Sequence, residues 1–160
     1  MVCVGNRAFC RNFIRYWLPV ILWMGFNFWM STEAFSAENT CSSIESFVRF
    51  FMPKLTPDNI GLINICMRKA AHLTEYFILG FLLYVAFRGR STRPWNWRWS
   101  LYAAMVVVVC AASDELHQSY VPSRTASIVD VSIDTMGGIL AQLTAILWYR
   151  PDRIQGKPPY

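Results

Sequence analysis

The stretch Arg68–Phe87, RKAAHLTEYFILGFLLYVAF, decides how this chain folds. Its first eight residues include four ionisable side chains, whereas the twelve that follow carry no charge. At a rise of 1.5 Å per residue, about 20 helical residues reach across the hydrocarbon core of a bilayer. The stretch therefore predicts a membrane-spanning helix that begins in a polar region.

The composition of the whole chain points the same way. Of its 160 residues, 54% are hydrophobic and only 16% are charged, against about 25% charged in an average soluble domain. So little charge leaves too little polar surface to cover a soluble globule, and it excludes a disordered or coiled-coil chain. Apolar runs predict spans at about 16–35, 68–87, 99–118 and 130–149. We expect an all-α polytopic membrane protein, a single domain over 1–160 built as a four-transmembrane-helix bundle.

The basic residues predict the orientation of these spans, because Lys and Arg in short loops stay on the cytoplasmic side. Ten of the 15 basic residues, together with the acid Asp152, flank the span ends on one side. These ten are Arg7, Arg11, Arg15, Arg88, Arg90, Arg93, Arg98, Arg150, Arg153 and Lys157. Both termini are therefore expected in the cytoplasm. The net charge of +5 then reflects topology and does not indicate a nucleic-acid partner.

The long outer connection, about residues 31–67, contains one further pattern. Apolar residues recur there with helical spacing at Ile44, Phe47, Val48 and Phe51. This spacing predicts a short amphipathic helix lying on the outer leaflet. Pro57 is expected to begin the helix that continues into the second span.

Two alternatives stay open near this connection. The basic start, the first apolar run and the small residues at Ala34–Ser36 also fit a cleaved secretory signal peptide, although a cleaved chain would leave its termini on opposite sides. The five cysteines include no zinc-type spacing. Cys41 and Cys66 would lie on the same outer side, and a disulfide between them is left open.

Polar side chains recur on the last three predicted spans. In the second span they follow one another at intervals of four, four and three residues, at Asn64, Arg68, His72 and Glu75. In the third span Asp114 and Gln118 share a helix face while Glu115 points elsewhere, and in the fourth Asp130 and Asp134 share a face with Gly137. At a rise of 1.5 Å per residue, Glu75, Asp114 and Asp134 lie about 18 to 22 Å from the inner ends of their spans. We expect one polar layer near the outer surface.

Charged groups inside a membrane are costly and indicate a functional site by default, although a purely structural role in holding the bundle together stays open. The candidate acid–base residues are His72, Glu75, Asp114, Asp130 and Asp134. The candidate substrate-binding residues are Arg68, Glu115, Gln118 and Arg124. An ion pair of Arg68 with Asp130 or Asp134 is expected. His72, Glu75 and Asp114 offer mixed nitrogen and oxygen ligands, but they do not form a HExxH motif, and neither a metal nor a cofactor is predicted.

Three segments, RKAAHLTEY, SDELHQ and SRTASIVDVSIDTMGG, resemble the motifs of the VanZ-like family in the same order. The resemblance covers about residues 67–140 and implies a small bacterial plasma-membrane protein. The family's namesake is associated with resistance to the glycopeptide teicoplanin. Where the family often has Asn, this chain has Asp134, which adds a carboxylate to the predicted site.

Three functions compete on these grounds. The first is a protein without catalytic activity that acts at the outer leaflet on a membrane lipid, a lipid-linked wall precursor or a glycopeptide antibiotic, with Arg68, Lys69 and Arg124 attracting anionic headgroups. The second is a membrane-embedded hydrolase or transferase that acts on a lipid phosphate. The third, a small ion-coupled carrier, is disfavoured because the chain has no internal repeat. Whether the chain is an enzyme, and its oligomeric state, are left open.

Overall fold

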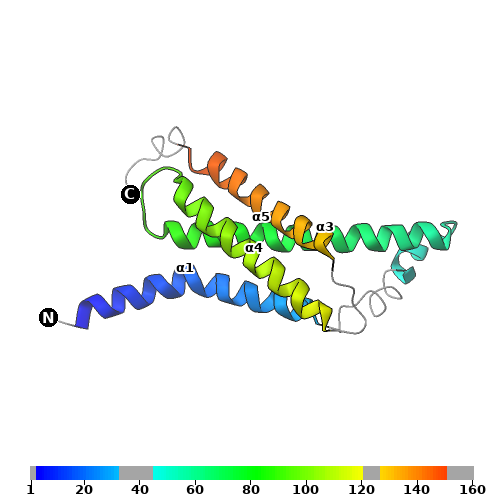
Figure 1. Cartoon of the computed structure of the whole chain (residues 1–160), viewed down its shortest axis with the longest axis horizontal. Coiled ribbons are helices and arrows are strands. Elements are labelled where there is room, and N and C mark those ends of the chain that lie inside the picture. The colour runs from blue at the N-terminus through cyan, green and yellow to red at the C-terminus, as the bar shows by residue number, and fades with distance from the viewer. Residues whose placement is uncertain (1–2, 33–44, 121–126, 151–160) are drawn as a thin grey trace.

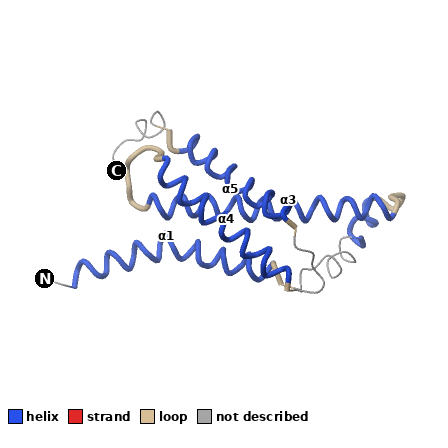
Figure 2. The backbone as a smooth tube through the Cα atoms, viewed as in Figure 1, coloured by secondary structure: helices blue, strands red, loops and turns tan. Residues whose placement is uncertain are grey.

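The computed structural model of the chain describes residues 3–32, 45–120 and 127–150. Its long helices are α1 (Cys3–Met30), α3 (Pro57–Arg88), α4 (Trp97–Ser119) and α5 (Ile128–Trp148). A short helix covers residues 45–51. Figures 1 and 2 show helices and connections only, and no strand occurs in the described residues. The all-α prediction is confirmed.

The structure supports three of the four predicted spans. Within the described residues, three helices, α3, α4 and α5, are long and apolar enough to cross a membrane. They contain or nearly coincide with the predicted spans 68–87, 99–118 and 130–149. The predicted first span, 16–35, coincides in part with α1, which is helical to Met30 but does not join this group. The reason is that α1 begins with several turns rich in Arg and Asn, and Asn27 interrupts the apolar part that follows.

Some earlier expectations concern residues that the structure does not describe. These are the end of the first predicted span, the alternative cleavage site Ala34–Ser36, Cys41 and Ile44. Of the predicted amphipathic helix, residues 45–51 are helical. An ion pair joins Arg49 Nε to Glu45 Oε1 at 2.8 Å on one side, and Phe47 and Phe51 are exposed.

The helix ends are set by local sequence. Helix α3 begins at Pro57, as predicted, and its first turns project well past the start of α5 (Figure 1). It ends at Gly89, whose φ of 56° favours glycine and whose N–H donates to the Val85 carbonyl at 2.9 Å. The side chains of Asn96 and Ser127 accept hydrogen bonds from backbone N–H groups in the first turns of α4 and α5.

Helices α3 and α5 run in the same direction and approach closely because small residues line their contact. A Cβ atom added to Gly80 would lie 3.1 Å from the Ala141 Cβ, and one added to Gly137 would collide with the Leu73 carbonyl oxygen. Helix α4 packs across them with Val107 directly against Gly138. In a membrane, where lipid competes for apolar contacts, such close backbone packing is a main source of helix association.

Helix α1 lies beside α3 in the opposite direction. Near the end of α3, Trp17 packs edge-on against Phe87 with ring centroids 5.2 Å apart. Farther along, the Trp23 indole N–H donates to the Glu75 carbonyl at 2.9 Å. After the helix ends, Ser31 accepts a hydrogen bond from Gln118 at 3.1 Å. The polar residues of the last three spans therefore lie at the end of the bundle where α1 finishes.

Candidate functional site

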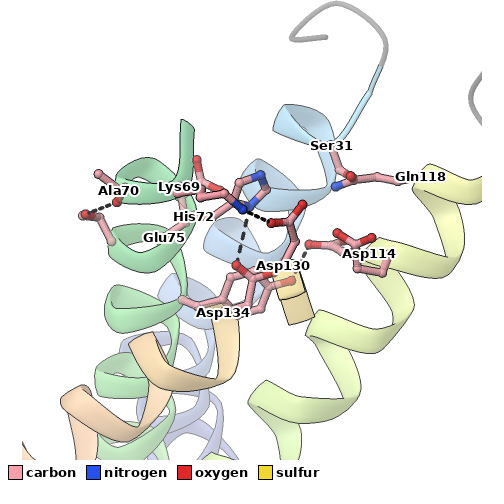
Figure 3. Close-up of polar contacts among 12 residues, drawn as sticks. Ser31, Lys69, Ala70, His72, Glu75, Asp114, Gln118, Asp130 and Asp134 are labelled. Atoms are coloured by element: carbon pink, nitrogen blue, oxygen red, sulfur yellow. Dashed lines mark hydrogen bonds and ion pairs between the residues drawn. The ribbon is translucent and has the colours of Figure 1, made fainter. Parts of the chain in front are cut away.

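One face of α3 presents the polar side chains of Lys69, His72 and Tyr76 to α4 and α5. Lys69 Nζ lies 2.7 Å from Asp130 Oδ1 in the first turn of α5. One turn farther along both helices, His72 Nδ1 lies 3.6 Å from Asp134 Oδ1. The two pairs follow each other because α3 and α5 are parallel and in register at this end. Figure 3 shows His72 above Asp134, with Asp130 beside them.

The two pairs differ sharply in exposure. The side chains of Lys69 and Asp130 are 42% and 26% exposed, whereas those of His72 and Asp134 are 20% and 1% exposed. Exposure thus falls from the outer pair, Lys69 and Asp130, to the inner carboxylate of Asp134, which is almost fully buried. Burial of a charged group is costly unless it is paired or meets a polar ligand, so the inner pair is the most costly part of the arrangement.

Helix α4 contributes the third carboxylate of this cluster. Asp114 Oδ2 accepts a hydrogen bond from the hydroxyl of Tyr76, whose side chain is buried. Tyr76 follows His72 by one helical turn, so both side chains belong to the same face of α3. His72, Asp114 and Asp134, three residues predicted from separate spans, are therefore brought to one place (Figure 3).

Glu115 and Gln118 are buried and connect neighbouring elements. Glu115 Oε2 accepts the backbone N–H of Ser127 at 2.7 Å and so holds the start of α5 to the end of α4. Gln118 Nε2 donates to Ser31 Oγ at 3.1 Å and joins α4 to the segment after α1. Both side chains hold the frame around the cluster, and their predicted contact with a substrate stays a prediction.

The expected ion pair of Arg68 is wrong, because Lys69 makes the contact with Asp130. At 100° per residue, the face of α3 that meets α5 is the one carrying residues 69, 72, 73, 76 and 80, and Arg68 lies to one side of it. The packing of small residues selects this face. Arg124 lies outside the described residues.

Glu75 lies on another side of α3, facing α1. It lines a shallow apolar hollow of about 440 Å³ together with Trp23, Thr74 and Ile78. Glu75 therefore lies at the α1 side of the cluster, whereas His72 faces α5.

Sequence reasoning missed three polar residues near the cluster. Tyr76 lies four residues after His72, and this spacing was the sequence signal that its side chain lies on the same face of α3. Gln142 is buried and donates to the Gly80 carbonyl at 3.1 Å. Asn27 is only 5% exposed, and neither polar atom of its side chain has a hydrogen-bond partner within the described part of the chain. An Asn in an apolar run was the available signal for Asn27.

The described residues do not offer the side chains that a metal ion needs. Across residues 3–32, 45–120 and 127–150, no group of three or more His, Cys, Asp or Glu side chains is placed to hold one. His72, Glu75 and Asp114, the alternative ligand set, therefore do not form such a group. What the cluster offers is a set of hydrogen-bond donors and acceptors beside an apolar bundle.

Three helices long and apolar enough to cross a membrane, with buried acidic groups between them, define an all-helical membrane protein with an internal polar site. The chain matches the model of the VanZ/LLP1 family over residues 16–149, and it belongs to that family. The match includes α1 from Tyr16 onward together with α3, α4 and α5. Searches of curated proteins and of solved structures gave no match.

Proposed function

We propose that this protein binds the polar part of an amphiphilic cell-envelope molecule at the cluster formed by Lys69, His72, Asp114, Asp130 and Asp134. The observation that carries the proposal is the graded exposure of the two pairs, from Lys69–Asp130 at the mouth to the enclosed Asp134. A group that enters between α3 and α5 meets a cation first and hydrogen-bonding side chains next, while its apolar part stays against lipid-facing helices.

The proposal includes a particular membrane arrangement. Helix α1 acts as a fourth span beside α3, supported by its opposite direction and by exposed apolar side chains such as Ile21, Leu22 and Phe28. The arginine-rich ends of the helices face the cytoplasm, as the distribution of Lys and Arg favours. Both termini are then cytoplasmic, the cluster opens toward the outer leaflet of the plasma membrane, and the helix over residues 45–51 lies on that leaflet.

Charge gives the site a preference for its ligand. Lys69 is the exposed cation at the mouth, Arg68 is one residue away, and Arg124 belongs to the connection that precedes α5. These cations attract an anionic headgroup, such as that of a lipid-linked wall precursor, to the rim of the cluster, where the carboxylates accept hydrogen bonds from its hydroxyl or amide groups. The family resemblance adds a glycopeptide of the teicoplanin type as a molecule whose access to the outer leaflet this site would alter.

A second candidate is a hydrolase or transferase acting on a lipid phosphate. The observation that favours it is the His72–Asp134 pair, in which the carboxylate Oδ1 lies 3.6 Å from the imidazole Nδ1. An imidazole beside a carboxylate acts as a general base or acid when a substrate lies within hydrogen-bond reach. Loss of a phosphate from a lipid substrate incubated with the purified protein would favour this candidate over simple binding.

The experiment replaces Asp114 with Asn and Glu75 with Gln, and measures membrane level, thermal stability, glycopeptide susceptibility and retained lipid. Each change removes a charge and keeps the shape, and relief of desolvation compensates for lost pairing. For Asp114→Asn, we expect a normal amount of protein in the membrane, together with loss of the effect on glycopeptide susceptibility and of the retained lipid. The control is Asp58→Asn, which removes an exposed carboxylate of α3 away from the cluster. A phenotype that only follows the amount of protein would refute a functional site.

A further inference from the structure

A second cavity lies at the opposite end of the bundle from the polar cluster. It has a volume of about 280 Å³ and opens between the first half of α1 and the end of α3. Its walls include Asn12, Tyr16, Trp17, Ala86, Gly89 and Arg90. The Trp17–Phe87 contact holds the two helices together on one side of this cavity. Toward its start, α1 runs away from the other helices (Figure 1), which leaves the cavity open.

The end of α3 keeps the mouth of the cavity free. Gly89 has no side chain, and the chain turns there with a φ of 56°. Arg90 follows immediately, is exposed and lines the cavity. Arg88 is occupied elsewhere, since its guanidinium donates to the Arg93 carbonyl at 3.1 Å and lies 4.4 Å from the centre of the Tyr149 ring. Two neighbouring arginines thus differ, one stabilising the helix end and the other facing an open cavity.

Among the described residues, the charge around the cavity has one sign. Arg11 and Arg15 are exposed on the same stretch of α1, and Arg15 lies 5.6 Å from the centre of the Tyr16 ring. Within the residues that the structure describes, every Asp and Glu belongs to the half of the molecule that contains the polar cluster or to the segment before it. This end of the bundle has no described carboxylate to neutralise its arginines, and it favours an anionic ligand.

The walls indicate that the ligand is amphiphilic. Tyr16 and Trp17 are aromatic residues of the kind that lies at headgroup level in a membrane. Phe13 also lines the cavity, and Phe13 and Ile14 are both exposed and apolar. Asn12 and Arg90 line the same cavity, so an amide and a guanidinium group are both available there to a polar ligand, next to exposed apolar residues of α1.

We propose that this cavity is a binding site for an anionic phosphodiester, carried by a membrane lipid, with Arg90 as its principal contact. Arginine binds phosphate through two parallel charge-assisted hydrogen bonds. The site is separate from the polar cluster, because it lies at the far end of α3 and is formed with the first half of α1. It does not depend on the function proposed above.

The test measures lipid binding to the full-length protein in a neutral detergent, with the shift in unfolding temperature and native mass spectrometry as readouts. Phosphatidylglycerol is compared with phosphatidylcholine of the same chains and with soluble glycerol phosphate. We expect saturable binding of phosphatidylglycerol and weaker binding of the other two. Glycerol phosphate that binds as tightly as the lipid would overturn the lipid source.

Variants then locate the site. Arg90→Gln should weaken phosphatidylglycerol binding about tenfold, the loss expected for one charge-assisted contact, without changing unfolding in the absence of lipid. Asn12→Leu keeps every charge and should weaken binding severalfold. The matched control is Arg98→Gln, which removes an exposed arginine at the start of α4 that does not line the cavity. Equal binding by Arg90→Gln and the unchanged protein, or an equal loss in Arg98→Gln, would overturn the proposal.

Discussion

The hydroxyl of Tyr76 connects two helices through a single hydrogen bond. It donates to Asp114 on α4, and the tyrosine itself is only 1% exposed. A carboxylate in an apolar bundle depends on such donors, because few water molecules reach it. The Tyr76–Asp114 contact therefore orients one acidic group of the cluster and adds to the packing of α3 against α4.

Replacing Tyr76 with Phe should lower stability while leaving the packing of the ring nearly unchanged. The cost should be about 1–3 kcal/mol, the range for losing one hydrogen bond to a charged group. Thermal unfolding of the purified protein in detergent measures it. Tyr102→Phe is the control, because Tyr102 is 49% exposed on the same pair of packed helices. Equal unfolding temperatures for both variants would contradict a role for the Tyr76 hydroxyl.

At the scale of elements, the contact of α3 with α5 determines the geometry of the cluster. Gly137 lies against the Leu73 backbone, and Gly80 lies against Gly138 and Ala141. The same register brings Lys69 to Asp130 and His72 to Asp134. Any change that separates the two helices therefore also separates both pairs.

A methyl group at Gly137 tests this dependence. Gly137→Ala places a Cβ against a backbone carbonyl that is fixed in α3, so the helices must move apart. We expect the free energy of unfolding to fall by about 1–3 kcal/mol, typical of overpacking. The effect on glycopeptide susceptibility should weaken with it. Gly61→Ala is the matched control, since a Cβ there meets nothing within 4 Å, and alanine is the better helix former by up to about 1 kcal/mol. A stable, fully active Gly137→Ala variant would show that this contact does not position the cluster.

At the scale of the whole molecule, the two ends of the bundle differ in charge. The described carboxylates lie toward one end and beyond it, whereas the ends of α3 and α5 and the starts of α1 and α4 carry arginine. This asymmetry is the basis for the proposed orientation. It also separates the two sites, the polar cluster at one end and the arginine-lined cavity at the other.

Cysteine labelling checks the orientation. In a background with the five native cysteines replaced by serine, Asn59→Cys should react with a membrane-impermeant maleimide in intact cells. Thr92→Cys should react only after the membrane is opened. Both positions are exposed in the structure, so accessibility within the protein does not explain a difference. Labelling of Thr92→Cys in intact cells would reverse the proposed topology.

Much of this architecture was predictable from local sequence. Apolar length predicted α3, α4 and α5, since a helix satisfies its own backbone hydrogen bonds and needs only apolar side chains to enter a bilayer. Pro57 marked the beginning of α3. The presence of an ionisable group near the same height in each of the last three spans was also readable, because helical rise converts residue number into depth.

What the tertiary structure decided is which of these groups meet. The contact between Gly80, Gly137, Gly138 and Ala141 rotates α3 so that Lys69, not Arg68, faces Asp130, and Glu75 turns toward α1. Local sequence assigns a side chain to a face of its own helix, but the face that becomes buried depends on where two backbones approach most closely. Packing also buried Asn27 and joined Tyr76 to Asp114. These contacts depend on how two helices are rotated relative to each other, and the residue pattern of a single helix does not determine that rotation.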